Sequence, residues 1–555
     1  MSKKIIIVGG VAGGASAAAR LRRLDESAEI IMLERGEFVS FANCGLPYYI
    51  GGTIQERSKL LVQTPENLKA RFRIDVRTFS EAVSIDPERK VIKIESRDRG
   101  AYEESYDDLI LSPGAKPIRP SIPGIDSPSI HTLRNIADTD RIKELVDREA
   151  TRSAVVVGGG YIGVEMAENL RERGLDVTLV EAAPHILAPF DSEMVVLAEK
   201  ELEEHGVQLR LNSPVQAFRI AEDGIGTVVE LGDGEAVTAD MVILAIGVMP
   251  DTGFLQGSGI QLGARGHIIV NEHMETNRPS IYAVGDAVET TDFIHGGKTA
   301  VPLAGPANKQ GRIAADRICG LDSSYKGTQG TAIIKVFGLT GASTGSNERT
   351  LNKLGVPYHA IYVHPVSHAG YYPGAKPMSL KLLFDEKGRV LGAQAFGEEG
   401  VDKRIDVIAT VIRLGGTVYD LTELELSYAP PYSSAKDPVN MAGYLAENVL
   451  EGRLNVFTVN ELDGVDSESV QLLDVRTVAE YGRGHLEGAL NIPVDDLRER
   501  LHELDRNKEV YAYCEVGLRG YIASRILSQH GFRVRNLTGG HKSCRIASFT
   551  PSLKK

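Results

Sequence analysis

The residues of greatest chemical interest are two of the four cysteines, Cys44 and Cys514. Cys514 follows the strand-like segment Glu509–Tyr513 and opens a glycine-containing loop that runs to Arg519 and on into a helical stretch. A cysteine in such a place is surrounded by backbone N–H groups of the loop and of the helix N-terminus. These donors stabilise a thiolate and then the anionic terminal sulfur of a persulfide, and Arg519 adds positive charge. The segment predicts a stabilised, nucleophilic thiolate.

Cys44 lies in the segment Ser40-Phe-Ala-Asn-Cys-Gly-Leu-Pro-Tyr-Tyr49. A lone cysteine is most often a small buried hydrophobe. The next cysteine in the sequence is Cys319, and the position five residues after Cys44 is Tyr49, so this segment contains no internal dithiol. A single redox thiolate cycles through a sulfenic acid, a persulfide or a mixed disulfide with a small thiol. The residues alone leave these three routes open.

A βαβ unit precedes Cys44, with strands predicted over Ile5–Val8 and Ile30–Leu33 and a helix over Ala15–Leu24. The turn after the first strand reads Gly-Gly-Val-Ala-Gly-Gly from Gly9 to Gly14. In a dinucleotide fingerprint, glycines at the first, third and sixth places allow the turn, the approach of pyrophosphate and helix packing. The first and sixth places fit, whereas the third is valine. Glu34, at the end of the second strand, is placed to accept a ribose hydroxyl.

A second unit of the same kind has strands predicted over Ser153–Val157 and Val177–Val180 and a helix over Val164–Arg173. Its turn satisfies the fingerprint in full. The three motif glycines are Gly158, Gly160 and Gly163. Glu181 closes the second strand, where a carboxylate binds a free ribose 2′-hydroxyl and repels a 2′-phosphate. The alanines that follow supply no compensating cation, so the sequence favours NADH over NADPH.

Length and composition set the frame for these motifs. The chain has 555 residues, enough for three to four domains, and a formal net charge of −13. That balance gives no global attraction to nucleic acid or anionic lipid. Cysteine spacing fits neither a disulfide scaffold nor a zinc ribbon, so we expect no metal site and a cytoplasmic protein. The longest apolar run, Met241–Met249, is too short for a membrane span, and the N-terminal run is too short for a signal peptide.

Changes of pattern along the chain suggest further domains. Short strands predicted over Ala332–Val336, Leu380–Phe384 and Val390–Ala395 alternate with helices and indicate an α+β domain. A last unit has strands predicted over Val470–Leu473 and Glu509–Tyr513. The expected order is a first nucleotide domain (1–150 and 266–327), a second inserted into it (151–265), the α+β domain (328–449), a linker (450–456) and a C-terminal domain (457–555).

Two further motifs make the first unit resemble the flavin domain of two-dinucleotide-domain flavoproteins. Thr276–Asp286 is similar to their second flavin motif, whose terminal aspartate holds the ribitol chain, and Leu111–Ala115 is similar to their short crossover motif. The resemblance implies that the first unit binds FAD and the second binds NADH. The flavin-site residues expected on this basis are Gly9, Gly14, Glu34, Asn43, Ser112, Gly285 and Asp286.

The Cys44 segment resembles the single-cysteine branch of the pyridine nucleotide-disulfide oxidoreductases, which contains coenzyme A-disulfide reductases, NADH oxidases and NADH peroxidases. Oxidases and peroxidases carry a histidine in the first glycine turn, where this chain has Ala12, and that departure weakens the peroxidase interpretation. The arginines of the first helix, Arg20, Arg22 and Arg23, resemble the branch's site for the phosphates of coenzyme A, to which Ser40 is added.

The α+β domain resembles the dimerisation domain of the same branch, which implies a homodimer. In coenzyme A-disulfide reductases two tyrosines of this domain reach the partner subunit's cysteine and donate protons or hydrogen bonds to the departing thiolate. Tyr428 matches one of them, and Tyr371 is preferred for the other, with Tyr372 as its alternative. Packing of aromatic side chains at the interface is the structural alternative.

The C-terminal unit strongly resembles a rhodanese domain. The resemblance rests on Leu473–Arg476, Gly484–Ala489 and Asn491–Pro493, followed by a six-residue loop from Cys514 to Arg519, a length that suits a sulfur atom. Asp474 and Arg476 are expected to brace this loop. His485, Tyr511 and Tyr513 are interpreted as structural, and Cys319 and Cys544 as non-catalytic.

Together these resemblances imply an α/β protein of two Rossmann-like domains, an α+β dimerisation domain and an α/β rhodanese domain. The family they indicate is the fusion of a coenzyme A-disulfide reductase-like flavoprotein with rhodanese, the NADH-dependent persulfide reductases. In that scheme NADH reduces FAD, and Cys44 receives the two electrons. The expected substrates of the protein are persulfides, polysulfides or coenzyme A disulfide. Coenzyme A is either a bound cofactor or a substrate. Plain coenzyme A-disulfide reduction and a sulfur-relay or redox-sensing flavoprotein stay open, with NADH oxidase or peroxidase as a third option.

Overall fold

The computed structural model describes residues 2–222, 224, 226–466 and 468–552. Its chain divides into two compact units. The first comprises Met1–Ala183 and Leu211–Gly330, and the second comprises Pro184–Arg210 and Thr331–Lys555. The predicted α/β fold class is confirmed: two sheets of the nucleotide-binding kind are followed by an antiparallel domain and a parallel C-terminal domain. Among the described residues, no helix is long and apolar enough to cross a bilayer.

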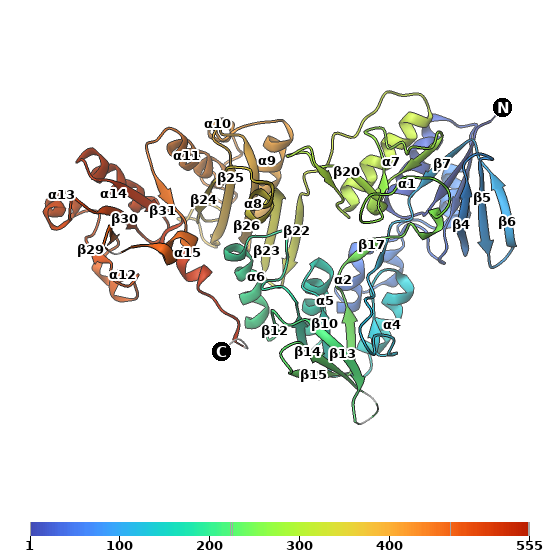
Figure 1. Cartoon of the computed structure of the whole chain (residues 1–555), viewed down its shortest axis with the longest axis horizontal. Helices are drawn as coiled ribbons and strands as arrows, with labels where there is room; N and C mark the ends of the chain where they lie inside the picture. Colours follow the sequence, from blue (N-terminus) through green and yellow to red (C-terminus); the bar gives the residue numbers. More distant parts are fainter. Residues whose placement is uncertain (1, 223, 225, 467, 553–555) are drawn as a thin grey trace. The chain divides into compact units, whose positions relative to one another are not determined.

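The first sheet of unit 1 is parallel, with strand order β19-β7-β1-β2-β3. Its strands are β1 (Lys4–Val8), β2 (Glu29–Leu33), β3 (Ile74–Arg77), β7 (Asp108–Leu111) and β19 (Ile281–Ala283). Helices α1 (Ala12–Leu24) and α7 (Ala304–Ile318) pack against each other beside this sheet (Figure 1). The β-branched residues of β1 are almost fully buried, which is typical of a parallel strand covered on both faces.

The second sheet of unit 1 runs β11-β10-β16-β9 and is also parallel. Its members are β9 (Ile130–His131), β10 (Ser153–Val157), β11 (Asp176–Val180) and β16 (Met241–Leu244), and α5 (Tyr161–Glu172) connects β10 to β11. Unit 1 also contains smaller sheets. One joins β4 (Ser80–Asp86), β5 (Val91–Ser96) and β6 (Gly100–Ser105), and another joins β13 (Val215–Ile220), β14 (Thr227–Leu231) and β15 (Ala236–Ala239). A third joins β18 (Ile268–Ile269), β20 (Val288–Thr291) and β21 (Lys298–Thr299), and β8 (Ala115–Pro117) pairs with β17 (Val248–Pro250). Helices α2 (Leu46–Gly51), α3 (Pro65–Phe72) and α4 (Ile136–Val146) complete the unit.

Unit 2 contains an antiparallel sheet with strand order β22-β23-β26-β25-β24. These strands are β22 (Ala332–Val336), β23 (Leu339–Gly345), β24 (His359–Val363), β25 (Met378–Phe384) and β26 (Val390–Gly397). The accompanying helices are α6 (Ser192–Glu204), α8 (Glu348–Leu354), α9 (Val401–Arg413), α10 (Val418–Glu423) and α11 (Pro438–Leu450). Both β25 and β26 are buried along their whole length, so they form the centre of this domain.

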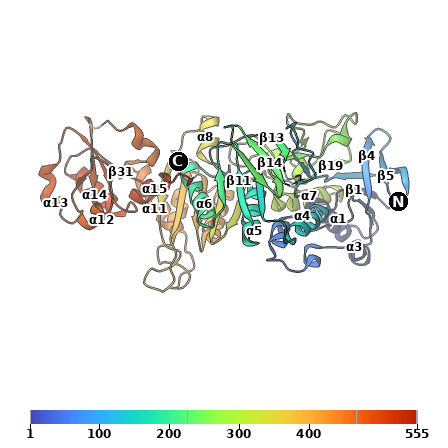
Figure 2. The ribbon, with the colours of Figure 1, turned by 90° about the horizontal axis from the view of Figure 1, so that it is seen from below.

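The C-terminal part of unit 2 is a parallel sheet of order β27-β31-β30-β28-β29. Its strands are β27 (Val456–Phe457), β28 (Val470–Asp474), β29 (Leu490–Asn491), β30 (Glu509–Tyr513) and β31 (Val534–Leu537). Helices α12 (Val478–Gly482), α13 (Leu497–Arg500), α14 (Leu518–Gln529) and α15 (Gly540–Ala547) complete it, and Figure 2 shows β31 with α12, α13 and α14 around it. Because β30 is the middle strand, the residue after it emerges at the centre of the carboxyl edge.

Candidate functional site

The first glycine turn joins β1 to α1 in the tight geometry of a dinucleotide cradle. Gly9 has a φ of +91°, and a Cβ there would overlap the carbonyl oxygen of Ser112. A Cβ on Gly14 would overlap the carbonyl oxygen of Gly9, so helix and strand can approach only without side chains. The Gly10 N–H donates to Oε2 of Glu34 at 3.3 Å. The carboxylate expected to bind a ribose therefore lies at the turn, and the residues fit FAD.

The second turn joins β10 to α5 and repeats this arrangement. Gly158 has a φ of +108°, and a Cβ on Gly163 would overlap the carbonyl oxygen of Gly158. No atom lies within 4 Å of the place where a Cβ on Gly160 would stand, so a phosphate has room to approach the backbone. Glu181 accepts from the Gly159 N–H at 2.6 Å, which holds its carboxylate at the turn, where the ribose is expected. These residues fit NADH.

Asp286, the last residue of the predicted second flavin motif, lies in a short 3-10 turn with Gly285. Its Oδ2 accepts from the guanidinium of Arg134 at 3.1 Å. The side-chain amide of Asn43 pairs with the same arginine, donating to the Arg134 carbonyl oxygen at 3.0 Å and accepting from its guanidinium at 3.2 Å. Arg134 therefore joins Asn43, next to Cys44, to Asp286. No sequence motif had singled it out, because its role depends on packing between distant segments.

Cys44 lies in a 3-10 turn, Asn43–Gly45, at the start of α2. The residue is exposed, yet the atoms around its thiol still remove much of the surrounding water. This desolvation raises the pKa of the Cys44 thiol, the carboxylates of Glu165 and Asp286 raise it further, and Arg134 acts in the opposite direction. The residues that the chain itself places around Cys44 thus favour the protonated thiol.

Glu165, which sequence reasoning missed, is on α5. Burial raises its pKa to about 7, with a further contribution from the carboxylate of Glu168, while a hydrogen bond with Tyr48 lowers it. Burial and the same two carboxylates raise the pKa of the Tyr48 phenol. The signal in the sequence was a pair of acids, Glu165 and Glu168, among the apolar residues in the first part of this helix. A carboxyl group that titrates near neutral pH beside a thiol is suited to exchange protons.

The three arginines of α1 are in different environments. Arg22 is buried, and its guanidinium donates to the carbonyl oxygens of Phe72, Asp25, Glu26 and Arg73. It therefore joins the end of α1 to the end of α3. Arg20 donates to Oδ1 of Asp316 at 2.7 Å. Arg23 is exposed. Ser40 is buried, and its carbonyl oxygen accepts hydrogen bonds from the N–H groups of Val62 and Gln63.

The Cys514 loop connects β30 to α14. Cys514 is 1 % exposed, and its Sγ accepts a hydrogen bond from the Gly517 N–H at 3.2 Å. Gly517 has a φ of +104°, which lets the loop curl around the sulfur before α14 begins. Arg519 is also within hydrogen-bonding reach of the Cys514 sulfur. The loop thus directs a backbone donor, a helix N-terminus and a cation at one atom.

Arg519 does not bring a free positive charge to this loop. Its guanidinium forms a two-pronged ion pair with the Glu480 carboxylate, with N–O distances of 2.6 and 2.7 Å. The hydrogen bonds from Arg519 hold the pKa of Glu480 well below its usual range. The positive charge expected from the sequence is therefore balanced by a carboxylate, and Arg519 is fixed in one orientation.

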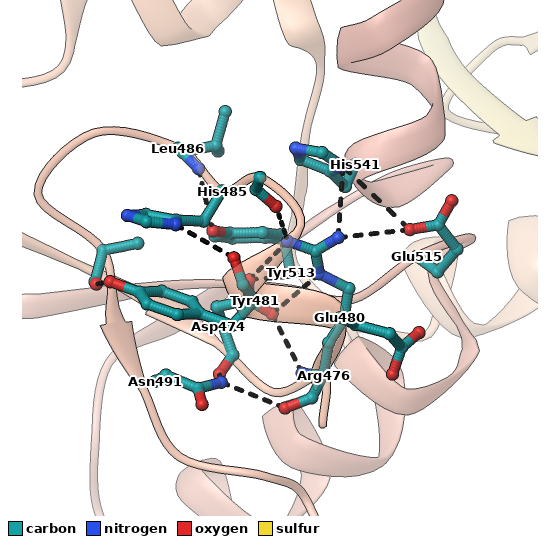
Figure 3. Close-up of polar contacts among 12 residues, drawn as sticks. Asp474, Arg476, Glu480, Tyr481, His485, Leu486, Asn491, Tyr513, Glu515 and His541 are labelled. Atoms are coloured by element: carbon teal, nitrogen blue, oxygen red, sulfur yellow. Dashed lines mark hydrogen bonds and ion pairs between the residues drawn. The ribbon is translucent and has the colours of Figure 1, made fainter. Parts of the chain in front are cut away.

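A buried polar network braces the other side of the loop (Figure 3). Arg476 is 2 % exposed and makes a two-pronged ion pair with Asp474. The same guanidinium donates to Oε2 of Glu515 at 3.3 Å and contacts Nδ1 of His541 at 3.2 Å. Desolvation and the charge of Arg476 lower the pKa of His541. Arg476 thus links the strand β28 to the second residue of the Cys514 loop.

The segment from Thr538 to Ser543 lies between the loop and the antiparallel domain. The N–H groups of His541 and Lys542 donate to the carbonyl oxygens of Cys514 and Glu515 at 2.8 and 2.9 Å. On the opposite side, Thr538 Oγ1 accepts from the Tyr362 N–H of β24 at 2.8 Å and donates to its carbonyl oxygen at 3.3 Å. The loop that holds Cys514 is thereby tied to β24.

His364, which follows β24, adds a second tie. Its Nε2 contacts Ser543 Oγ at 2.8 Å, and its Nδ1 contacts Ser379 Oγ at 2.9 Å. Desolvation and the nearby Lys542 and Arg545 lower the pKa of His364 to about 3. The imidazole is therefore neutral at physiological pH, and both ring nitrogens are used in hydrogen bonds.

The residues that the sequence analysis interpreted as structural or non-catalytic are packed or hydrogen-bonded within the fold. Tyr513 is fully buried, and its hydroxyl accepts from the Leu486 N–H at 3.1 Å. The His485 ring stacks on Tyr481 with the ring centroids 3.7 Å apart. Burial raises the pKa of Cys544 to about 11, and desolvation also raises the pKa of Cys319. Raised thiol pKa values make both cysteines poor nucleophiles.

In the antiparallel domain the hydroxyls of Tyr371 and Tyr428 lie 2.7 Å apart. Both side chains are exposed, to 75 % and 46 % respectively. Tyr372 instead packs edge-on against His368 and donates its backbone N–H to the carbonyl oxygen of Ala369. Of the two tyrosines considered for this position, Tyr371 is the one that pairs with Tyr428.

Three carboxylates of the same unit, Asp191, Glu193 and Glu348, converge in the arrangement of a metal-ligand set. The ammonium of Lys381 occupies their centre, at 2.7 Å from Asp191 Oδ2 and Glu348 Oε2 and in contact with Glu193. This cation already balances the acidic cluster, so the cluster holds helix α6 to the sheet.

Comparison with protein families identifies all three parts of the chain. Residues 3–311 match the model described as "Pyridine nucleotide-disulphide oxidoreductase", and residues 331–438 match the dimerisation domain of that family. The chain belongs to this family. Residues 461–546 match the rhodanese-like domain. The protein is therefore a flavin-dependent oxidoreductase that uses FAD and NADH, with a dimerisation domain and a C-terminal rhodanese domain.

Individual relatives support the same assignment. The chain is 40 % identical over 448 residues to the coenzyme A disulfide reductase of Staphylococcus aureus, covering 80 % of this chain and 100 % of the relative. It superposes on reduced Bacillus anthracis CoADR-RHD with a TM-score of 0.96 and 52 % identity, covering 99 % and 98 % of the two chains. A NAD-dependent persulfide reductase from A. fulgidus gives a TM-score of 0.91 and 38 % identity, covering 98 % and 100 %.

Proposed function

We propose that this protein uses NADH to reduce disulfide and persulfide forms of coenzyme A at Cys44, and that Cys514 delivers the sulfane sulfur. The observation that carries the proposal is the presence of two different single-thiol sites in one chain. One lies near Asp286 of the second flavin motif and Glu165 of α5, and at the other the Gly517 N–H donates to the Cys514 sulfur.

Sulfur transfer begins when the Cys514 thiolate attacks the outer sulfur of a persulfide or polysulfide donor. The S–S bond of the donor breaks, the donor leaves as a thiol, and the terminal sulfur of the new Cys514 persulfide accepts the loop N–H groups. The thiolate of coenzyme A then attacks that sulfur. This forms coenzyme A persulfide and restores the Cys514 thiolate without any net redox change.

Reduction takes place at Cys44. The Cys44 thiolate attacks the coenzyme A sulfur of the persulfide, which forms a mixed disulfide with coenzyme A and releases sulfide; from coenzyme A disulfide the same attack releases a coenzyme A thiolate. NADH supplies, through FAD, the two electrons that cleave the mixed disulfide to two thiolates. The Tyr371 and Tyr428 hydroxyls provide a proton for the departing sulfur, and Glu165 is a proton reservoir near Cys44.

We further infer that the protein acts as a homodimer in which the tyrosine pair of one subunit completes the Cys44 site of the other. The dimerisation domain and the unusually high exposure of two phenolic rings that bond to each other support this arrangement. Arg20, Arg23 and Ser40 are the proposed site for the coenzyme A phosphates. Arg23→Ala should raise KM for coenzyme A disulfide with little change in kcat, whereas Arg89→Ala, an exposed arginine elsewhere in unit 1, should leave both unchanged.

Steady-state kinetics test the main proposal. We expect coenzyme A persulfide to show a higher kcat/KM than coenzyme A disulfide and to release sulfide. Cys514→Ser should slow turnover of polysulfide and protein-bound persulfide donors while coenzyme A disulfide turnover stays unchanged. A Cys514→Ser protein that turns over every such donor at the wild-type rate would exclude the transfer role. Preference for the disulfide would favour plain coenzyme A-disulfide reduction.

A further inference from the structure

The tyrosine pair lies on two exposed segments whose position requires a separate explanation. Tyr371 belongs to the connection between β24 and β25, and Tyr428 to the connection between α10 and α11. Their hydroxyls are 2.7 Å apart although both side chains are exposed, to 75 % and 46 %. Burial of the phenols therefore cannot hold them together. The two segments must be fixed by the residues beneath them.

Arg404 lies beneath both segments, on the first turn of α9. It is 1 % exposed and is among the largest fully buried side chains of the described residues. Its Nη2 donates to the Ser367 carbonyl oxygen at 2.9 Å and to Ser433 Oγ at 3.1 Å. Ser367 is four residues before Tyr371, and Ser433 is five residues after Tyr428. One guanidinium thus contacts both tyrosine-bearing segments.

Asp437 fixes the orientation of that guanidinium. Its carboxylate accepts from Arg404 Nη2 at 3.1 Å and from Nε at 3.4 Å, and its Oδ2 also accepts from Ser433 Oγ at 2.7 Å. Asp437 is also the N-cap of α11, where its side chain accepts from the Val439 N–H. The ion pair therefore fixes the arginine relative to this helix. A planar fork of donors in this geometry sets direction as well as distance.

The two segments are also joined directly above the arginine. The Ala369 N–H donates to the Ser433 carbonyl oxygen at 3.0 Å. The Tyr371 segment closes on itself, since the Ser367 and Lys376 backbones exchange hydrogen bonds at 2.8 Å and, through Ser367 Oγ, at 3.0 Å. At the start of α9, a Cβ on Gly400 would overlap the Arg404 guanidinium, so the backbone there leaves room for this side chain.

We propose that Arg404 is the positioning residue that holds Tyr371 and Tyr428 at hydrogen-bonding distance, so that the pair presents one proton donor to the departing thiolate. Replacing a buried ion pair by apolar groups is often neutral for stability, so conformational specificity is the better account of why it is present. The hydrogen bond between the two phenols also raises the pKa of Tyr371, so this phenol stays protonated at neutral pH. The inference rests on the proposed role of the tyrosine pair.

The test is a double-mutant cycle in the full-length holoenzyme. Because Arg404→Met alone would leave a buried carboxylate, the variant is Arg404→Met with Asp437→Asn. We measure flavin reduction by NADH and, separately, reoxidation of the reduced enzyme by coenzyme A disulfide. We expect reoxidation to slow about tenfold and flavin reduction to stay within twofold. Arg404→Lys keeps the charge but loses the planar fork, so we expect it to slow reoxidation nearly as much.

The decisive measurement repeats the substitution in the Tyr428→Phe background. If Arg404 acts through the tyrosine pair, removing it there slows reoxidation by less than twofold further. An equal tenfold loss in both backgrounds would overturn the inference, because the arginine would then act through the general fold. If Tyr371→Phe and Tyr428→Phe each reoxidise at the wild-type rate, the proposed role of the tyrosines fails instead. Flavin content and melting temperature, measured on every variant, identify unfolding.

Discussion

Around Cys514 the chain places a backbone N–H against the sulfur, a helix N-terminus behind it and an arginine beside it. Around Cys44 it places two carboxylates whose charge, together with desolvation, raises the thiol pKa. Both residues are single thiols at the start of a helix. The sulfur-transfer cradle is complete in the folded chain alone, whereas a thiolate at Cys44 must be stabilised by what binds next to it. In the proposed mechanism, sulfur capture at Cys514 and electron delivery to Cys44 would thus use two thiols in different electrostatic environments.

The largest expected effect comes from exchanging either sulfur for oxygen. Cys44→Ser should lower NADH-dependent reduction of coenzyme A disulfide by ~10³-fold or more, because no other thiol can form the mixed disulfide. Sulfur transfer from thiosulfate to cyanide should stay unchanged. Cys514→Ser should give the opposite pattern, and Cys319→Ser, a matched control, should affect neither assay. If one substitution abolishes both activities, the two sites are not independent and the comparison fails.

The rigidity of the cradle can be tested at Gly540. This residue has a φ of +61°, and a Cβ would overlap the Cys514 carbonyl oxygen, so Gly540→Ala must displace the loop. We expect the rate of thiosulfate-dependent transfer to fall by ~10²-fold, comparable with the loss of one catalytic donor. Gly488→Ala is the matched control, since its φ is +76° but its Cβ would meet open space. A similar loss in both variants would point to backbone strain and not to the loop contact.

Substituting Glu165 removes one of the two negative charges near Cys44. Glu165→Gln should lower the pKa of the Cys44 thiol, so alkylation by iodoacetamide should become faster, by up to ~10-fold per pKa unit, at pH 8. Because the pKa of Glu165 is about 7, the carboxyl is neutral at pH 5.5, and the difference from wild type should disappear there. Glu172→Gln, at the exposed end of the same helix, should change nothing. A pH-independent increase would contradict the electrostatic explanation.

The same raised pKa has a consequence for stability. The carboxyl titrates at about 7 in the folded state and near 4.5 when unfolded, so the folded state holds the proton more tightly. The stability this provides is fully present below pH 4.5 and is lost as the pH rises through about 7. The free energy of unfolding, measured with urea, should therefore fall less steeply over this range in Glu165→Gln. Parallel slopes would show that the group titrates normally.

The smallest expected effect concerns Thr538. Thr538→Val removes both hydrogen bonds to β24, each worth about 1 kcal/mol, and should slow sulfur transfer about threefold while coenzyme A disulfide reduction is unchanged. Thr538→Ser keeps the hydroxyl and should restore the rate. If Thr538→Ser slows transfer as much as Thr538→Val, the two hydrogen bonds of the hydroxyl do not explain the effect.

The parts of the fold that could be predicted were those with a local signal. The strands Ser153–Val157, Ala332–Val336 and Glu509–Tyr513 have the predicted bounds, because each is an apolar or alternating run between turn residues. The two fingerprint helices begin three residues earlier than predicted. Glycine has low helix propensity, yet Gly14 and Gly163 belong to the first helical turn, where close approach outweighs propensity.

The candidate site shows the same limit. Cys44, Cys514 and the motif glycines could be found because their chemistry depends on neighbours in sequence. Arg134, Glu165 and Arg404 could not, because each acts on segments that are distant in the sequence and its position is set by packing. Charge compensation is also invisible along the chain: Arg519 reads as a free cation until Glu480, from another helix, lies against it.

The hydroxyl of Thr538 has a practical consequence for anyone who dissects this protein. Cutting the chain after α11 would leave the partners of Thr538 and Ser543 on the discarded piece, and the segment that backs the Cys514 loop would then face water. If Cys514 transfers sulfur as proposed, a truncated C-terminal fragment would therefore do so more slowly than the intact protein. Grafting another rhodanese onto the same linker would need the threonine and serine as well as the cysteine.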